Sequence, residues 1–339
     1  MIKYIMLCLV AVFSSIALAE MPIETNPLYL ISKDYERGYI NREGKIVISP
    51  QFEVADNFKE GLAAVSSVWG GKYWYIDKSG KVVIDSQFDE AGSFTEGLAA
   101  VCISPQWGFI DKTGKFVIEP QFLKVGPFSD GLAAVRDGEL WGYIDKSGKV
   151  VIVPQFVRPG VFSEGLALVS MDTLWGYIDT TGIQVIKPHY DGAFDFSEGL
   201  ALVKIADHDK WGYIDKTGEI VISSQFEVAD NFKEGLASVR LDSLFGYIDK
   251  AGKFVIAPNF HYAGSFFDGL AYVKVGGKWG YIDKTGKYVI GLEYTWAEDF
   301  SNGLAKVNFY ADDDSLQWGY IDKKGVSVWK TTEYYNDGK

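Results

Sequence analysis

The chain repeats itself, and this repetition limits what it can fold into more than any other feature. The thirteen residues QFEVADNFKEGLA occur at 51–63 and again, unchanged, at 225–237. A shorter motif, WGYID or a close variant, recurs every 34 to 39 residues. Its last residue falls at Asn41, Asp77, Asp111, Asp145, Asp179, Asp215, Asp249, Asp283 and Asp322. A period of about 20 to 50 residues is typical of a protein built by stacking copies of one structural unit.

Each copy predicts a small β-sheet. The unit reads approximately W-G-Y-I-D-K-[S/T]-G-K-x-V-I-x-P-Q-F-x-x-A-x-x-F-S-E-G-L-A-x-V. The β-prone runs on both sides of the Asp-to-Gly turn indicate a tight hairpin, and G-L-A-x-V indicates a third strand. Proline after V-I cannot donate to a ladder, so we expect it to end the second strand. Apolar residues three apart, such as Phe122, Val125 and Phe128, predict one helical or 3₁₀ turn in the connector.

The expected fold class is therefore all-β, a tandem array of about eight to nine three-stranded antiparallel units. One such unit is marginally stable alone, because three short strands cannot bury two apolar faces. We expect neighbouring units to cover one another's aromatic faces. On this basis the Trp of each motif belongs to the core, and replacing Trp175 by Ala should cost about 3–5 kcal/mol.

The repeated WGYIDKSGK, PQF and FSEGLA segments resemble the WG repeat, also called the KWG repeat, of bacterial exported proteins. The resemblance covers nearly the whole chain after the first residues. It departs from the pattern at Trp74, which replaces the Gly, at Phe245, which replaces the Trp, and in the last copy, which lacks PQF. What the resemblance implies is a β-rich repeat scaffold. It brings no catalytic residues with it.

Strand counting bears on whether the array closes. Nine hairpins and eight G-L-A strands make 9 × 2 + 8, or 26 strands, counted along the sequence. A closed propeller-like ring of identical three-stranded units needs a multiple of three. The surplus hairpin favours an open superhelical array slightly over a closed toroid.

The two ends of the chain differ from the repeats. Residues 1–19 combine a Lys, an apolar run and a small-residue ending, which is typical of a cleaved secretory signal. A membrane anchor is the alternative, but the run is shorter than the roughly 20 residues that a span needs. We expect a lead-in at 20–36, the repeat domain at 37–330 and a tail at 331–339. The protein is then exported, to the periplasm, the cell surface or the medium.

Charge and cysteine content exclude several classes of partner. The formal net charge is −12, so nucleic acid and anionic lipid surfaces, which bind basic patches, are poor partners. Without the signal, only Cys102 remains, so no internal disulfide can form. The position of Cys102 after G-L-A-A-V predicts a buried small side chain. We expect a monomer with no membrane insertion after signal cleavage.

Catalytic and metal-binding signatures do not emerge from the sequence. It has three His and no zinc, nucleotide or serine-hydrolase motif. The Asp that ends each WGYID should accept hydrogen bonds from the following turn. A glycosidase needs two opposed carboxylates, whereas Glu60, Glu96, Glu164, Glu198 and Glu234 precede G-L-A in equivalent places. We therefore expect turn-forming acids, no cofactor, no metal and no enzyme.

Three insertions are the candidate binding loops. They all lengthen the connection between the G-L-A-x-V strand and the next Trp, at 66–72, 204–210 and 308–317, so they should emerge on one side of the array. The candidate residues are Trp69, Lys72, Asp207, His208, Asp209, Asp312, Asp313 and Asp314. The acidic loops could hold Ca²⁺, but the spaced ligands of an EF-hand are absent, which favours solvated loop tips.

Two functions remain open at this point. The first is a non-catalytic exported scaffold that binds a protein or a cell-envelope polymer through many equivalent contacts. The alternative is a carbohydrate-binding module or a carbohydrate-active enzyme in which exposed aromatic rings stack on sugars. Burial of Trp107, Trp141, Trp175, Trp211 and Trp279 between units, which we expect, would remove the main support for the sugar hypothesis.

Overall fold

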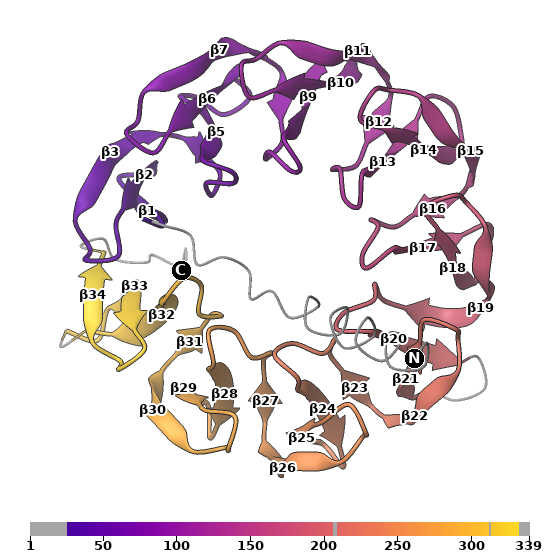
Figure 1. The fold of residues 1–339 in the computed structure, drawn as a ribbon. Helices are drawn as coiled ribbons and strands as arrows, with labels where there is room; N and C mark the ends of the chain where they lie inside the picture. The colour runs from indigo at the N-terminus through magenta and orange to yellow at the C-terminus, as the bar shows by residue number, and fades with distance from the viewer. Residues whose placement is uncertain (1–25, 206–208, 312, 332–339) are drawn as a thin grey trace, which may run out of the picture.

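The computed structural model describes residues 26–205, 209–311 and 313–331, and these form a ring of small antiparallel β-sheets (Figure 1). The expected signal at 1–19 and all but the first residue of the expected tail lie outside the described residues. Within the described part of the chain every regular element is a strand. It contains no helix long and apolar enough to cross a membrane.

Each unit is a sheet made from consecutive residues. We number the units 1 to 9 along the chain, and unit 2 is the first with all the parts of the repeat. It runs from a two-residue strand, β4 (Val54–Ala55), through β5 (Leu62–Ser66) and β6 (Tyr73–Asp77) to β7 (Val82–Phe88), and the strands pair in that order. The short strand lies toward the centre of the ring and the last strand forms its outside (Figure 1). The G-L-A strand is thus paired with the WG strand that follows it in sequence.

The other units repeat this order. Units 3 and 4 comprise β8 (Glu90–Ala91), β9 (Leu98–Ile103), β10 (Gln106–Asp111), β11 (Phe116–Phe122), β12 (Lys124–Val125), β13 (Leu132–Arg136), β14 (Trp141–Asp145) and β15 (Val150–Phe156). Units 5 and 6 comprise β16 (Arg158–Pro159), β17 (Leu166–Ser170), β18 (Trp175–Asp179), β19 (Gln184–Ala193), β20 (Leu200–Ile205), β21 (Trp211–Asp215) and β22 (Ile220–Phe226). These two units share β19 and so form one seven-stranded sheet.

Three further units complete the second half of the ring. Units 7 and 8 comprise β23 (Val228–Ala229), β24 (Ala237–Leu241), β25 (Leu244–Ile248), β26 (Phe254–Phe260), β27 (Tyr262–Ala263), β28 (Ala271–Val275), β29 (Lys278–Ile282) and β30 (Tyr288–Tyr294). Unit 9 comprises β31 (Trp296–Ala297), β32 (Leu304–Tyr310), β33 (Leu316–Asp322) and β34 (Ser327–Lys330).

Two local predictions about the unit were wrong. The connector forms a short strand and a tight turn instead of a helical or 3₁₀ turn, because its backbone bonds to the next strand, as Asp56 N–H does to the Ala64 carbonyl at 3.0 Å. The outer strand also continues through the proline. Pro120 lies inside β11, where a register shift between the pairs Trp107–Phe122 and Phe109–Ile118 leaves it in a bulge on the sheet edge. An edge strand loses no partner when one N–H is missing.

The first unit contains a strand that the sequence pattern does not reveal. β1 (Tyr29–Lys33) carries no G-L-A signal, yet it pairs along its whole length with β2 (Glu36–Ile40), which pairs with β3 (Ile46–Phe52). The count of 26 strands was therefore one too low, and the described residues form nine units of three main strands. The slight preference for an open array was also wrong, because units 1 and 9 lie side by side and close the ring (Figure 1).

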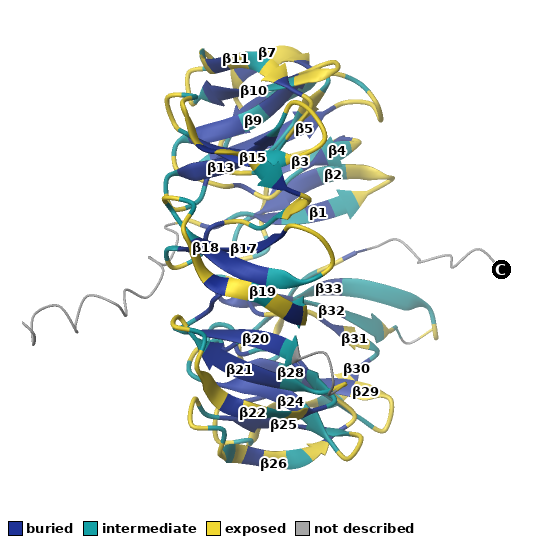
Figure 2. Ribbon diagram, turned by 90° about the vertical axis from the view of Figure 1, so that its right-hand side faces the viewer, coloured by how far each residue is buried: buried dark blue, intermediate teal, exposed yellow. Residues whose placement is uncertain are grey.

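The hydrophobic core lies between units. One cluster joins Tyr177 and Ile186 of unit 5 to Phe196, Val203 and Ile214 of unit 6, and the other clusters join neighbouring units in the same way. Figure 2 shows the inner strands buried and the outer strands with alternating exposed residues. The expected mutual covering of neighbouring sheets is therefore present. It depends on the Tyr of the motif, since Tyr177 is 0% exposed.

This Tyr also carries a hydrogen bond to the next unit. Its hydroxyl donates to a connector carbonyl, as Tyr177 does to Phe194 at 2.8 Å. The same bond joins Tyr39 to Asp56, Tyr75 to Gly92, Tyr143 to Gly160, Tyr213 to Asp230, Tyr247 to Gly264 and Tyr281 to Glu298. Unit 3 has Phe109 at this place, which keeps the ring contact with Phe128 and has no hydroxyl.

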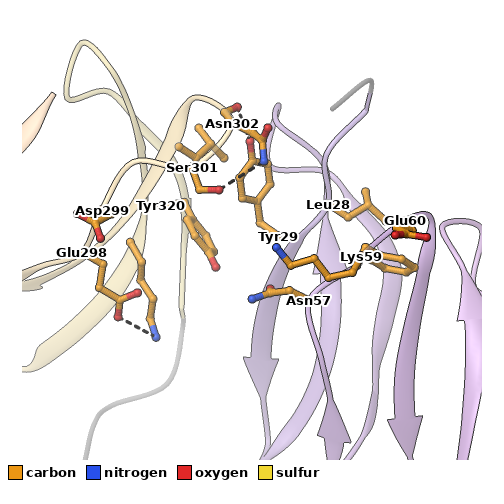
Figure 3. A pocket seen from close by; sticks show the side chains of 13 residues that line it. Leu28, Tyr29, Asn57, Lys59, Glu60, Glu298, Asp299, Ser301, Asn302 and Tyr320 are labelled. Carbon is orange, nitrogen blue, oxygen red and sulfur yellow. Dashed lines mark hydrogen bonds and ion pairs between the residues drawn. The ribbon is translucent and has the colours of Figure 1, made fainter. Parts of the chain in front are cut away.

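The seam between units 9 and 1 repeats these contacts. The Tyr320 hydroxyl donates to the Leu30 carbonyl at 2.8 Å, and the Tyr29 hydroxyl donates to the Asn302 carbonyl at 2.7 Å. Figure 3 shows these side chains facing one another from the two ends of the chain. Gly44 also lies against the Val328 backbone, as Gly114 lies against the Ile84 side chain elsewhere, so a Cβ at either position would collide with its neighbour. Both residues also take a positive φ, which favours glycine. The ring is therefore closed by packing between two complete sheets.

Replacing Tyr177 by Ala should lower the free energy of unfolding by about 3–5 kcal/mol, because it empties a buried site between units 5 and 6. Tyr177→Phe should cost about 1 kcal/mol, since only the hydrogen bond to Phe194 is lost. Trp175→Ala should cost less than Tyr177→Ala, because Trp175 is half-exposed. Chemical denaturation of the three variants measures these values. A larger loss for Trp175→Ala than for Tyr177→Ala would contradict the assignment of the core.

Candidate functional site

The two edges of the ring carry different loops. Because the strands of each unit are antiparallel, the turns alternate between the edges. One edge holds the D-K-[S/T]-G hairpins and the S-E-G turns. The other, which we call the Trp edge, holds the connections between the G-L-A strands and the WG strands. The three long insertions belong to this connection in units 2, 6 and 9, so all of them lie on the Trp edge, as expected.

The described candidate loop residues bond within their own insertion or to a neighbouring connector. Trp69 is 81% exposed, and its backbone N–H donates to Glu53 at 2.5 Å. Lys72 forms an ion pair with Asp89 of unit 3 at 2.7 Å, and Asp209 forms one with Lys204. These side chains come from separate units and do not form one constellation.

The acidic insertion of unit 9 is a turn. The Asp313 carboxylate accepts from the Ser315 N–H at 3.1 Å, and Asp314 takes a positive φ of 62°. Asp207, His208 and Asp312 lie outside the described residues. Among the residues that the structure does describe, no group of three or more His, Cys, Asp or Glu side chains is arranged to hold a metal ion.

The Trp side chains do not lie where the sequence predicted. Of these five Trp residues, only Trp279 is fully buried; Trp107, Trp141, Trp175 and Trp211 are partly exposed. The expectation of burial was wrong for these four because the Trp begins its strand at the edge of the ring, whereas the Tyr two residues later lies between the sheets. The discriminating observation therefore does not remove the sugar hypothesis.

A cation covers the aromatic ring in several units. The end of each G-L-A strand pairs with the Trp position across the sheet, as Arg136 does with Trp141. The Arg136 guanidinium lies 5.5 Å from the Trp141 ring, and the Lys274 ammonium lies 5.2 Å from the Trp279 ring. Such contacts are attractive because the face of the ring is negative. The same strand position supplies Arg240 on Phe245, whereas the cations on Trp175 and Trp318 come from other positions, Arg158 of the connector and Lys306 within its strand.

Cys102 occupies the same strand position in unit 3, between Glu90 and Trp107. It is buried, as the sequence predicted. Burial raises the pKa of its thiol, with the negative charges of Glu90 and Asp89 acting in the same direction. The neutral thiol is a poor nucleophile, which fits a packing role.

Aromatic side chains concentrate at units 8 and 9 of the Trp edge. Tyr262, Tyr272, Trp279 and Trp296 line a pocket of about 700 Å³ together with Lys274. The Trp279 ring lies 5.4 Å from Tyr262, 5.6 Å from Tyr272 and 5.3 Å from Trp296. Volumes of about 300 to 1,000 Å³ with mostly apolar walls are typical of small-molecule sites. We call this hollow the aromatic pocket.

Sequence reasoning missed the aromatic pocket, although its signal is present. Tyr262 and Trp296 occupy the first connector position, where units 2 to 6 have Val54, Glu90, Lys124, Arg158 and Gly192. Tyr272 likewise replaces the small or aliphatic residue of the G-L-A-x-V strand. Only the structure brings these three substitutions into one place.

A second hollow, of about 300 Å³, lies at the seam (Figure 3). Tyr29, Ser301, Asn302 and Tyr320 line it, and they include the residues that hold units 1 and 9 together. This hollow therefore belongs to ring closure.

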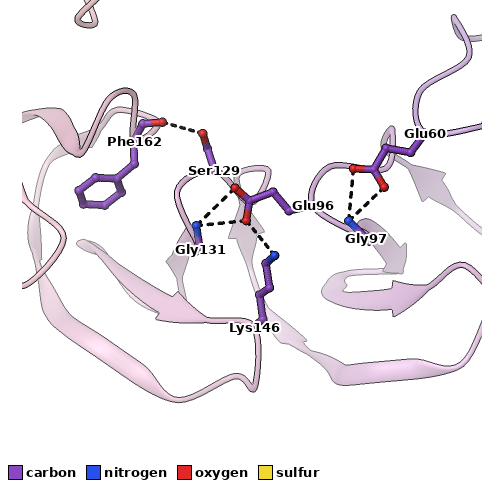
Figure 4. Close-up of polar contacts among 7 residues, drawn as sticks. All are labelled: Glu60, Glu96, Gly97, Ser129, Gly131, Lys146 and Phe162. Atoms are coloured by element: carbon purple, nitrogen blue, oxygen red, sulfur yellow. Dashed lines mark hydrogen bonds and ion pairs between the residues drawn. The ribbon is translucent and has the colours of Figure 1, made fainter. Parts of the chain in front are cut away.

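The repeated Glu residues before G-L-A join neighbouring units. The Glu96 carboxylate accepts from the Gly131 N–H of unit 4 at 3.1 Å and pairs with Lys146 at 3.0 Å (Figure 4). Equivalent bonds run from Gly97 to Glu60, Gly165 to Asp130, Gly199 to Glu164, Gly235 to Glu198, Gly269 to Glu234 and Gly303 to Asp268. At the seam Asn302 stands in this position, and Arg42 lies against Gly303. The positive φ of Glu60, Glu96, Glu164, Glu198 and Glu234 fits the turn role expected for these acids, and their carboxylates add a second role at the junctions between units.

Comparison with known families identifies the repeat. A family model described as "WG containing repeat" matches residues 38–73, 75–104, 107–141, 141–173, 175–207, 211–244, 245–279 and 279–309. The chain belongs to the WG-containing repeat family. This confirms the resemblance noted in the sequence. No curated protein matches this sequence.

Several solved structures are similar to this WG-repeat protein at low identity. Kluyveromyces lactis Hsv2p is 10% identical with a TM-score of 0.41, over 67% of this chain and 94% of that chain. Dihydro-heme d1 dehydrogenase NirN in complex with DHE is 13% identical with a TM-score of 0.46, over 90% and 72%. Virginiamycin B lyase from Staphylococcus aureus is 12% identical with a TM-score of 0.36, over 68% and 92%. These scores are too low to carry an argument about this chain.

The Asp that ends each WG motif stabilises its turn, as predicted. The Asp145 carboxylate accepts from the Ser147 hydroxyl at 2.6 Å and from the Ser147 and Lys149 N–H groups at 2.9 and 3.1 Å. The Ser147 hydroxyl is the main cause that lowers the pKa of Asp145. The pKa values of Asp77, Asp111, Asp179, Asp215 and Asp283 are lowered in the same way. These carboxylates are bound in turns, which leaves little capacity for acid-base chemistry.

Removing one of the acids between WG repeats should loosen one junction. Glu96→Ala should lower the free energy of unfolding by about 1 kcal/mol, because the Gly131 N–H loses its charged acceptor. Glu96→Gln should lose less, since its amide oxygen still accepts that bond. Thermal unfolding of the two variants gives the comparison. Equal losses would mean that the Lys146 ion pair, and not the hydrogen bond, holds the junction.

The stability of the protein should rise and then fall on acidification. Desolvation, with the charges of Asp230 and Glu298, raises the pKa of Asp299 to about 6. Desolvation also raises the pKa of Asp230. These groups bind protons more readily when folded, so stability increases as the pH falls from about 7 toward 4. The turn carboxylates act oppositely, and their contribution is lost below about pH 4.

Unfolding temperatures measured between pH 3 and 8 test this profile. Asp299→Asn should flatten the rise between about pH 7 and 5 and leave the fall below pH 4 unchanged, since the turns are untouched. A wild-type unfolding temperature that increases steadily from pH 4 to 7 would show that the raised pKa values do not control stability.

Proposed function

We propose that this WG-repeat protein is a non-catalytic scaffold that binds an extended partner along the Trp edge of its ring. The observation that carries the proposal is the repetition of partly exposed aromatic residues at one strand position, in units 2 to 6 and 9, on the same edge as exposed apolar loop residues. A partner that follows the ring would meet the same type of contact in unit after unit. Weak contacts in series give high overall affinity when their spacing matches.

The two edges of the ring differ in how exposed their side chains are, and this difference supports binding along the Trp edge. The carboxylates of the hairpin edge are engaged in turns and in junctions between units, as for Asp145 and Glu96. The Trp edge carries the three insertions and exposed apolar side chains such as Trp69, Leu140 and Met171. Loops held by a rigid scaffold are the usual place for binding residues.

The compartment and the partner class follow from the sequence. The segment at 1–19 has the features of a secretory signal, so the proposed scaffold is exported and meets partners in the cell envelope or outside the cell. A net charge of −12 disfavours nucleic acid and anionic membranes. The partner is therefore a protein or a cell-envelope polymer.

A carbohydrate-binding module is the second candidate. The observation in its favour is the partial exposure of Trp107 and Trp211, which have no cation over their rings in the described structure, since stacking on sugars requires accessible rings. A module of this kind is compatible with the scaffold, because a glycan chain is itself an extended partner.

A pull-down from the cell-envelope fraction tests the scaffold. The triple variant Trp69→Ser, Leu140→Ser, Met171→Ser should reduce the recovered partner at least fivefold, because it removes exposed apolar contacts on the Trp edge. The matched control is Ile183→Ser, Val326→Ser, which removes exposed side chains on the hairpin edge and should recover as much partner as wild type. Equal losses in both variants, or no partner from any fraction, would leave a passive spacer as the better account.

A further inference from the structure

The aromatic pocket differs from the rest of the Trp edge in offering two open rings beside a buried one. Tyr262 is 42% exposed and Trp296 is 51% exposed, whereas Trp279 between them is 4% exposed. The three come from neighbouring connectors and from the WG strand of unit 8. Two accessible rings on either side of an aromatic floor form a place to hold a flat, weakly polar ligand.

Charge decides against two kinds of occupant. The Lys274 ammonium already lies 5.2 Å from the Trp279 ring, so a cationic ligand would compete with it and be repelled. A polyanion would be repelled by the protein as a whole, because its net charge is −12. A neutral ligand meets neither obstacle.

Two polar groups of the pocket, the Lys274 ammonium and the Trp279 indole, can only donate hydrogen bonds, beside the Tyr262 and Tyr272 hydroxyls and the His261 ring, which can also accept. Lys274 makes no ion pair with any described residue, so its ammonium can donate to a ligand. The indole N–H of Trp279 is buried and has no hydrogen-bond partner in the described structure. An unpaired buried donor is uncommon and costs free energy. An occupant rich in hydroxyl and ether oxygens would accept from the Lys274 ammonium, and ligand binding beside the Trp279 ring would change the surroundings of its unpaired N–H.

We propose that the aromatic pocket binds a neutral pyranose ring of a β-linked, gluco-configured glycan. In such a ring the hydroxyl groups are equatorial and the axial C–H bonds form two flat apolar faces. The C–H groups are weakly positive and the aromatic faces of Trp296 and Tyr262 are negative, so the two surfaces attract. The oxygens at the ring edge then accept from Lys274. This inference rests on the proposed binding function and assigns a ligand class to one part of the edge.

Calorimetric titration of the full chain with cellotetraose and with tetra-N-acetylchitotetraose tests the proposal. We expect at least one of the two to bind with a Kd below about 1 mM. The preferred tetrasaccharide then distinguishes a plain glucan from an N-acetylated, wall-type glycan. Trp296→Ala should weaken that binding at least tenfold, and Lys274→Gln at least threefold. Ile183→Ser, which removes an exposed apolar side chain on the hairpin edge, should leave it unchanged.

An independent readout guards against a variant that fails to fold. If Trp296→Ala unfolds, Tyr262→Ser takes its place, with the unfolding temperature as the check. In the wild type, the indole N–H signal of Trp279, assigned with a Trp279→Phe variant, should shift in the NMR spectrum during titration. A proline-rich peptide and a tetragalacturonate serve as the competing ligand classes.

Each outcome either supports or overturns the assignment. It is overturned if neither neutral tetrasaccharide binds, if Trp296→Ala and Tyr262→Ser bind as well as wild type, or if the peptide or the acidic sugar binds more tightly. Its failure is separable from failure of the scaffold. The pull-down variant lies in units 2, 4 and 5 and leaves the aromatic pocket intact, so a captured partner with no sugar binding would retain the scaffold and remove only the sugar site.

Discussion

The ring depends on the buried aromatic residue of each WG motif, which packs against the next repeat. In eight of the nine described units this residue is a tyrosine whose hydroxyl also bonds to the backbone of the next repeat, and in unit 3 the ring of Phe109 makes the contact alone. A buried hydroxyl must be paired, so the connector of the next unit has to present a carbonyl at a fixed place. This requirement suits an extended connector, whose backbone also pairs with the next strand even beside Phe109, as Gly126 N–H does with the Ala134 carbonyl at 2.8 Å. In a helical turn the carbonyl of Phe194 would be used within the turn, and Tyr177 would lose its acceptor. The same contact also sets the spacing of the units.

Much of this arrangement could be predicted from sequence periodicity, and the failures have physical causes. The repeat, the hairpins and the covering of one sheet by the next follow from recurring residues. Trp and Tyr could not be ranked for burial by alternation alone, because both lie on one face of a strand and only the position of the strand end separates Trp175 from Tyr177. β1 was missed because pairing with β2 makes it a strand, and no local motif marks Tyr29–Lys33.

The candidate site could also be predicted only in part from the sequence. The insertions at the Trp edge were visible in the sequence because they break the period, and their common side followed from strand direction. The aromatic pocket leaves the period intact, since Tyr262, Tyr272 and Trp296 are substitutions at ordinary positions. Their proximity arises from two neighbouring units, and it needs the sheets in place to be recognised.

Closure by two complete sheets has a consequence for the order of folding. Within the body of the ring, the tyrosine hydroxyl bonds link residues 17 positions apart, and the longest of the other side-chain bonds between units links residues 55 apart. At the seam the separations are 273 and 290. Local contacts form early because their loop-closure entropy is small, whereas distant ones wait for the chain to bring them together. Neighbouring units can thus fold onto one another first and form an open, curved array, and docking of its two ends is the last and slowest step.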